Sequence, residues 1–193
     1  MKIRPLSLIL GLLVPAMLLF SSACSVESIR ISSMHVRAYT ALESGKYGVA
    51  IDHYRNILAL DPDDRDALIA VGRCLIHVND ADGAVQALLH AREIDPRKDS
   101  AAAYLGLAFL LNDQKARAID EWEDFIAGNP GSSLTPVLRE RVEHLTSGQT
   151  TDASPAGGDL HAAASLIDEI EGALARDRAA AEKEAAGGGG GCG

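Results

Sequence analysis

The stretch NILALDPDD, residues 56–64, ends an apolar helical run with an acidic residue and a proline. Similar endings return in AREIDPRK, residues 91–98, and in DFIAGNPGS, residues 124–132, so that Pro62, Pro96 and Pro130 stand 34 residues apart. Proline lacks an amide hydrogen and clashes with the preceding helical turn, so each of these residues ends a helix. This regular spacing predicts three repeated units, 31–64, 65–98 and 99–132.

Each unit predicts two antiparallel helices, near 32–43 and 48–59 in the first unit. Gly45, Asn79 and Asp113 stand between the two halves, and these residue types tolerate the backbone conformation of a helix exit. After each proline, Asp63, Asp64 or Asp66, and then Asp99 or Ser100, can cap the next helix. Small residues recur at the eighth and twentieth positions, where they allow close backbone approach, and larger residues stand at the twenty-fourth. These packing positions are Ala38, Gly72 and Gly106; Ala50, Ala84 and Ala118; Tyr54, Leu88 and Trp122.

Period, small-residue columns and closing proline together resemble the tetratricopeptide repeat family over residues 31–132. The resemblance implies an all-α fold, an α-solenoid of three helix-turn-helix repeats. LTPVLRERVEHL, residues 134–145, has apolar residues on one side and predicts a capping helix, which closes a repeat domain at 31–145.

The resemblance also implies a concave groove formed by the first helix of each pair. Carried over position by position, the groove residues would be His35, Tyr39, Arg73, Ile76, His77, Ala103, Leu107, Leu110 and Leu111. The third helix of this set, AAAYLGLAFLL, is apolar all round, which indicates that its groove face is covered. A hydrophobic partner segment or the helix at 160–174 could cover it, or its leucines could simply pack against the capping helix. Asp66, Ala70 and Ser100 depart from the family's carboxylate-clamp pattern, so no recognition of a C-terminal carboxylate is expected.

Residues 1–23 have the pattern of an export signal, with a basic start, an apolar stretch of 15 residues and small residues at the end. SSAC, ending at Cys24, resembles the lipobox of bacterial lipoproteins, which implies lipidation of Cys24 and a tether at 24–30. Ser21 departs from that pattern, and cleavage for plain secretion is the alternative. Under the lipoprotein resemblance, Ser25 implies sorting to the outer membrane, with the domain on its periplasmic face.

The chain after the repeat domain divides into three parts. Residues 146–159 are rich in turn formers and predict a flexible linker. Residues 160–186 predict an amphipathic helix with an Ala-rich, charged continuation, and residues 187–193 predict a Gly-rich tail. An isolated helix of this kind is marginal in water, so it should dock on its own domain, a second copy or another protein. Cys192 is either an exposed thiol or an intermolecular disulfide tether, whereas Cys74 is expected in the core.

Several functional classes are disfavoured by composition and spacing. A formal charge of −9 without a basic stripe argues against nucleic acid as a partner. Histidines and cysteines do not pair at metal-ligand spacing, DPDDRD at 61–66 fits helix capping better than a calcium loop, and no phosphate loop or nucleophile motif occurs. Glu121, Glu123 and Asp124 are interpreted as a solvated face around Trp122. We therefore expect no cofactor, no metal and no enzymatic activity.

The sequence as a whole predicts a scaffold of the bacterial cell envelope that binds a peptide or helix of a protein partner in its groove. Small lipoproteins of this repeat class resemble assembly factors for envelope, pilus or secretion complexes. One alternative is a structural oligomer in which helix 160–174 of one copy fills the groove of another. A further alternative is a thiol-dependent accessory factor that uses Cys192.

Overall fold

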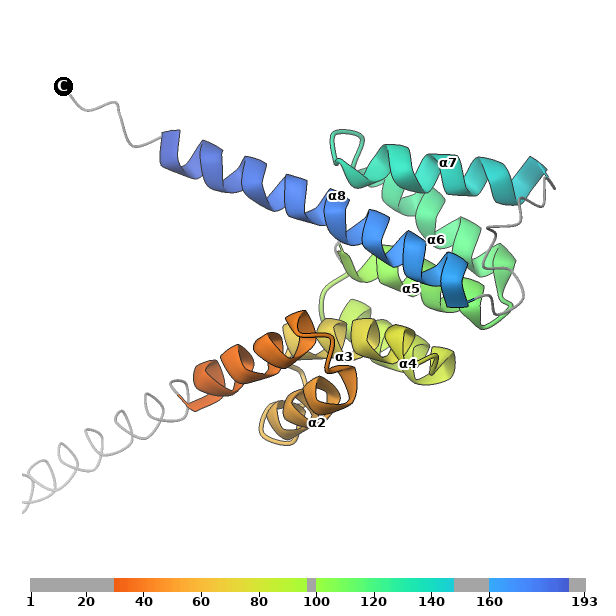
Figure 1. The fold of residues 1–193 in the computed structure, drawn as a ribbon. Coiled ribbons are helices and arrows are strands. Elements are labelled where there is room, and N and C mark those ends of the chain that lie inside the picture. The colour runs from red at the N-terminus through yellow and green to blue at the C-terminus, as the bar shows by residue number, and fades with distance from the viewer. Residues whose placement is uncertain (1–29, 97–99, 148–159, 188–193) are drawn as a thin grey trace, which may run out of the picture.

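The computed structural model describes residues 30–96, 100–147 and 160–187, in which every regular element is an α-helix. Residues 30–43 form the first helix, called here the 30–43 helix. It is followed by α2 (Tyr47–Leu58), α3 (Arg65–His77), α4 (Ala81–Ile94), α5 (Ser100–Leu111), α6 (Lys115–Gly128), α7 (Leu134–Ser147) and α8 (Leu160–Gly187). Figure 1 shows the helices stacked side by side, with α8 lying across the later ones.

The helices pack in chain order. α3 contacts α2 and α4, α5 contacts α4 and α6, and α7 contacts α6, while α8 returns to contact α5 and α7. The 30–43 helix shares a single apolar core with them through Ala38, Ala41 and Leu42. Three helical hairpins followed by a capping helix make an α-solenoid, so the predicted fold class is confirmed.

The turn inside each hairpin has the same conformation in all three units. Gly45, Asn79 and Asp113 have positive φ angles of 68°, 61° and 55°. In the first turn the amide of Gly45 donates to the carbonyl of Leu42 and that of Lys46 to the carbonyl of Ala41, each at 2.9 Å. This pairing satisfies the last carbonyls of a helix. The left-handed residue expected between the helical halves is therefore present at each predicted position.

The small-residue columns provide space for the large residue sixteen positions later. A Cβ atom on Gly72 would lie 2.5 Å from Leu88, and one on Gly106 would overlap the indole ring of Trp122. Trp122 is fully buried, and its Nε1 donates to the carbonyl of Ala103 at 3.1 Å. Glycine at these positions allows the two helices of a hairpin to approach. The remaining predicted packing residues of the columns are buried as well: Ala38, Ala50, Tyr54, Ala84 and Ala118.

The connections between units contain the predicted helix-ending prolines and a predicted capping residue. Pro62, Pro96 and Pro130 are exposed and stand shortly after α2, α4 and α6. Of the three candidate caps for α3, Asp64 is the one that acts, because its Oδ1 accepts from the amide of Ala67 at 2.9 Å. Asp80 caps α4 in the same way through the amide of Gly83, which the sequence interpretation did not single out.

Two helix ends differ slightly from the predicted boundaries. α7 continues to Ser147, so the first two residues assigned to the linker are helical, and α8 includes Gly187. The remainder of the linker, the export signal, Cys24, Cys192 and the candidate cap Asp99 lie outside the described residues. Among the residues that are described, no helix combines the length and apolarity needed to cross a membrane.

Candidate partner-binding cleft

The C-terminal helix covers the apolar end of the solenoid. α8 packs against α5 and α7, and its residues Leu166, Ile167, Ile170 and Ala173 are at most 2% exposed. Residues 101–110 of α5 are all buried. The apolar composition of α5 predicts that its groove face is covered. That face is covered in the structure, and α8 of the same chain contributes to the cover.

This docking changes the interpretation of the third set of predicted groove residues. Ala103, Leu107 and Leu110 are at most 1% exposed and Leu111 is partly buried, so they do not offer an open surface. The backbone of Ala103 faces α6, since its carbonyl accepts from Trp122. The groove at α5 is thus closed within the chain.

A polar contact joins α8 to the second repeat. Arg73 Nε donates to Glu171 Oε1 at 2.5 Å, and Arg73 Nη1 lies 3.4 Å from Glu43 Oε1. Burial by itself would raise the pKa of Glu171, but His77 and Arg73 outweigh it and hold that pKa below its usual value. Burial would likewise lower the pKa of Arg73, and the hydrogen bond to Glu171 reverses the shift. Both groups are therefore charged in the docked state.

His77 has a different environment from the one predicted for a groove residue. Its ring stacks on Tyr47 with centroids 3.9 Å apart, and its Nε2 is 3.7 Å from Glu171 Oε1, beyond hydrogen-bond reach. Ile76, assigned to the groove as well, is 2% exposed. His77 and Ile76 therefore contribute to packing within the solenoid, and His77 lies beside the residue of α8 that pairs with Arg73.

A second polar contact fixes α8 further along its length. The Asp177 carboxylate accepts from Ser132 Oγ at 2.5 Å and from the Ser133 amide at 2.8 Å, just before α7 begins. Burial alone would raise the pKa of Asp177, but these hydrogen bonds lower it overall. Because Asp177 directly precedes Arg178, this contact holds the turn of α8 that carries Arg178.

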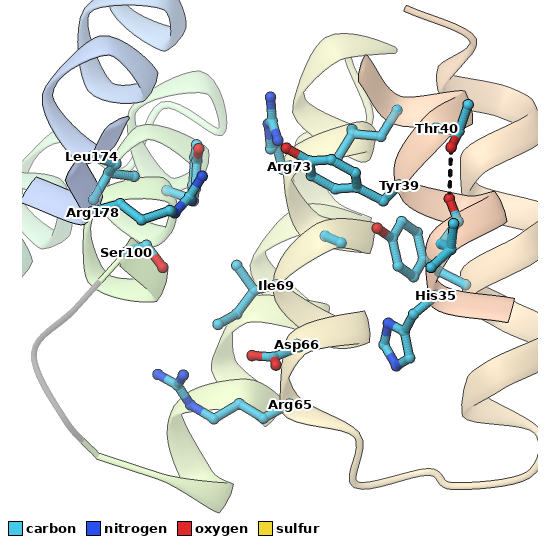
Figure 2. Close-up of a pocket in the computed structure, with 15 residues that line it drawn as sticks. His35, Tyr39, Thr40, Arg65, Asp66, Ile69, Arg73, Ser100, Leu174 and Arg178 are labelled. Carbon is cyan, nitrogen blue, oxygen red and sulfur yellow. Dashed lines mark hydrogen bonds between the residues drawn. The ribbon is translucent and has the colours of Figure 1, made fainter. Parts of the chain in front are cut away.

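Beyond α8 an open cleft of about 650 Å³ remains between the 30–43 helix, α3, α5 and α8. Figure 2 shows its two walls, with Tyr39 and His35 on one side and Leu174 and Arg178 on the other. Three of the predicted groove residues, His35, Tyr39 and Arg73, line this cleft. Tyr39 is 49% exposed, so its ring is accessible to a ligand in the cleft.

The wall formed by the first repeat is held by internal contacts. His35 Nε2 lies 2.7 Å from Asp64 Oδ2, and the His35 ring meets Tyr54 edge-on with centroids 6.1 Å apart. Tyr54, expected as a packing residue, is buried yet also lines the cleft, and burial raises its pKa to about 12. Asp64 thus both caps α3 and positions His35, so helix capping accounts for this acid of the DPDDRD stretch.

The wall formed by α8 was missed at the sequence level. Leu174 belonged to the predicted apolar stripe, but Arg178 lay in the part described only as a charged continuation. Arg65, the first residue of α3, also lines the cleft. The spacing of residues along α8 indicates one apolar face but carries no information on which helix that face contacts.

The predicted solvated acidic face around Trp122 is wrong at one residue. Glu123 and Asp124 are exposed, but Glu121 is only 6% exposed and its Oε2 accepts from Arg92 Nη1 at 2.5 Å. A carboxylate becomes buried where a cation from the neighbouring helix pairs with it. Arg92 is on α4, so the pair joins the second and third repeats.

The other chemistry-bearing residues are structural in this part of the chain. Cys74 is a free, fully buried thiol, and burial raises its pKa to about 12, which keeps it protonated and unreactive. Within the described residues no cluster of His, Cys, Asp and Glu has the arrangement of a metal site.

Comparison with known proteins agrees with this architecture. Residues 41–108 match the family model described as tetratricopeptide repeat. The fold is an all-α solenoid whose helical hairpins are similar to that repeat. The matched segment runs from the end of the 30–43 helix to α5, so it includes the whole second helical hairpin and the residues of α3 and α5 that line the cleft. No curated protein matches the chain. Tetratricopeptide repeats generally mediate protein–protein interactions.

Proposed function

We propose that this chain is a non-enzymatic scaffold that binds a peptide or helix of a protein partner in the cleft between the 30–43 helix and α8. The observation that carries the proposal is the open volume of about 650 Å³ on the side of the solenoid where the first helices of the repeats lie. Next to this cleft, α8 already packs against α5 and α7. A partner would therefore use the preformed cleft, whose walls are fixed by the His35–Asp64 and Asp177–Ser133 contacts.

The cleft has the mixed character of a recognition surface. Its lining combines the aliphatic residues Val36, Ile69 and Leu174 with tyrosines and arginines. Tyrosine and arginine are enriched where proteins bind other proteins, because they combine a large contact area with hydrogen-bonding ability. Binding here would proceed through surface complementarity, with no bond made or broken.

The cell envelope is the proposed location, on the strength of the sequence before residue 30. An export signal at residues 1–23, followed directly by Cys24, supports a lipoprotein held at the periplasmic face of the outer membrane. There the solenoid would act as an assembly factor for an envelope, pilus or secretion complex. A soluble periplasmic or secreted form is the alternative that follows if Cys24 is not lipidated.

Site-specific photocrosslinking in cells tests the cleft as the partner site. A photoreactive amino acid replaces Tyr39 in the cleft or, as a matched control, Glu123, which is exposed on α6 and does not line the cleft. The expected result is a discrete crosslinked protein from position 39 and none from position 123. Crosslinking from position 123 alone would place the partner elsewhere and refute the proposal.

A self-assembling oligomer is the second candidate, and the packing of α8 against α5 within one chain supports it. Exchange of α8 between two copies would use the same contacts that it makes within one chain. Sedimentation equilibrium separates the two candidates. A mass that stays monomeric as concentration rises supports the scaffold, and a concentration-dependent dimer or larger species supports exchange.

A further inference from the structure

We infer that the cleft selects a segment with acidic side chains, and that α8 forms the wall that receives them through Arg178. This inference rests on the proposed function, since it names the chemistry of the partner at the same cleft. It also gives α8 a role beyond covering α5, namely that of a constituent of the binding site.

The lining of the cleft holds more basic than acidic side chains, unlike the chain as a whole. Acidic residues outnumber basic ones in the chain as a whole, 27 to 18. The cleft is lined by three arginines, Arg65, Arg73 and Arg178, and by a single carboxylate, that of Asp66. Basic side chains gathered in a concave surface attract groups of the complementary sign, here carboxylates.

Arg178 is the arginine best placed to bind such a group. Arg73 is already paired with Glu171 and Glu43. Arg178, in contrast, forms no hydrogen bond or ion pair with any described residue, and its side chain extends from α8 toward the cleft (Figure 2). A guanidinium group in this position can bind a carboxylate through two parallel hydrogen bonds.

Two contacts of the preceding residues in α8 hold the backbone at Arg178 in place. Asp177 accepts two hydrogen bonds at the start of α7, from Ser132 and Ser133. Four residues before Arg178, Leu174 packs against the apolar core and also lines the cleft. This turn of α8 is therefore anchored, so Arg178 is presented to the cleft by a fixed backbone. Pre-organisation of this kind reduces the entropic cost of binding.

The apolar part of the lining favours a peptide over a nucleic acid. Val36, Ile69 and Leu174 would contact hydrophobic side chains that flank the acids. A nucleic acid needs an extended basic surface, whereas the three arginines are confined to one cleft of about 650 Å³. The occupant is thus a short protein segment in which acidic and apolar side chains alternate or adjoin.

Selection from a phage library of random dodecapeptides against the purified full chain provides the test. Display on the coat protein leaves no free C-terminus, so only side-chain carboxylates can contribute. Selected peptides are then synthesised and measured against Arg178→Glu and, as a control with the same change of charge, Lys183→Glu. Lys183 is an exposed residue of α8 that does not line the cleft. Far-UV circular dichroism verifies that both variants stay folded.

We expect the selected peptides to be enriched in Asp and Glu. The Arg178→Glu substitution should lower their affinity about tenfold or more, whereas Lys183→Glu should change the affinity by less than about twofold. Truncation after Ala175, which keeps the buried part of α8 and removes Arg178, should also weaken binding. Peptides without acid enrichment, or acidic peptides equally affected by both substitutions, would overturn the inference and leave the proposed function standing. A library that yields no binder would count against both.

Discussion

Arg73 of α3 donates a hydrogen bond of 2.5 Å to Glu171 of α8, across 98 residues of sequence. Arg73 occupies a position where the family resemblance implies contact with a partner. In this chain the guanidinium of that position is already bound by an acid of the C-terminal helix. The groove is therefore divided into a part closed by α8 and a part, the cleft, that stays open.

The first prediction concerns the effect of pH on the docking of α8. The pKa of Glu171 in the docked state is lower than its usual value of 4.5, and that of Asp177 is lower than 3.8. Docking therefore favours the ionised carboxylates. The stabilisation that they give to docking is fully present at pH values above the usual pKa values, and it is lost as the pH falls through the lowered pKa values of the docked state. Hydrogen exchange of residues 165–187, corrected for intrinsic rates, should show protection at pH 7 that decreases below about pH 4.

Glu171→Gln tests the same contact at neutral pH. It removes the charge but keeps the shape, so protection of α8 should fall by about 1–2 kcal/mol. The matched control is Glu169→Gln, because Glu169 is half exposed and lies 3.7 Å from Arg141. A surface pair of that kind contributes about 0–1 kcal/mol, and the control should be nearly neutral. Equal effects of the two substitutions would show that the Arg73–Glu171 pair does not hold α8.

Much of the fold could be predicted because its determinants are local. The residue types at the three turns, Gly45, Asn79 and Asp113, are themselves ones that tolerate a positive φ angle. The ends of the helices follow from nearby prolines and capping residues. The pairing of Gly106 with Trp122 was also accessible, since a fixed period aligns the two columns. Local conformation and near-neighbour packing are what a repeat encodes directly.

The site was less predictable because it depends on where a distant helix docks. The apolar stripe of α8 indicates a buried face but not its partner, so docking on the same domain was only one of three alternatives. Consequently Arg178 could not be assigned to the cleft, and Ala103 and Leu107 were assigned to the partner-binding groove, although α8 of the same chain contributes to their cover. The burial of Glu121 was missed for a similar reason, since its partner Arg92 lies in the preceding repeat.

Gly106→Ala should destabilise the protein by about 1–3 kcal/mol through overpacking. The added methyl group would overlap the Trp122 indole, which is fully buried and hydrogen bonded to the Ala103 carbonyl. Trp122 is the single tryptophan of the chain, so its fluorescence during urea unfolding reports the change directly. Unaltered stability, together with an unshifted emission maximum, would contradict the close approach of α5 and α6.

Gly45→Ala and Gly48→Ala should change stability in opposite directions. Neither methyl group would meet another atom within 4 Å, so packing plays no part. Gly45 has a φ of 68°, where alanine costs about 1–2 kcal/mol, whereas Gly48 lies within α2, where alanine gains roughly 0.5–1 kcal/mol. Urea denaturation of both variants measures the difference, and a stabilised Gly45→Ala variant would refute the left-handed turn.

Cys24→Ala should abolish lipid attachment if the chain is a lipoprotein. In cells fed radiolabelled palmitate, the wild-type chain should carry the label and fractionate with membranes, because two or more acyl chains give stable anchoring. Cys192→Ala is the matched control, since it removes another cysteine outside the described residues and should leave the label unchanged. Cys74 is unsuited to that purpose, because it is fully buried and its loss would disturb the core. An unlabelled wild-type chain that appears in the soluble periplasmic fraction would instead identify plain secretion, and the cleft would then meet its partner free of the membrane.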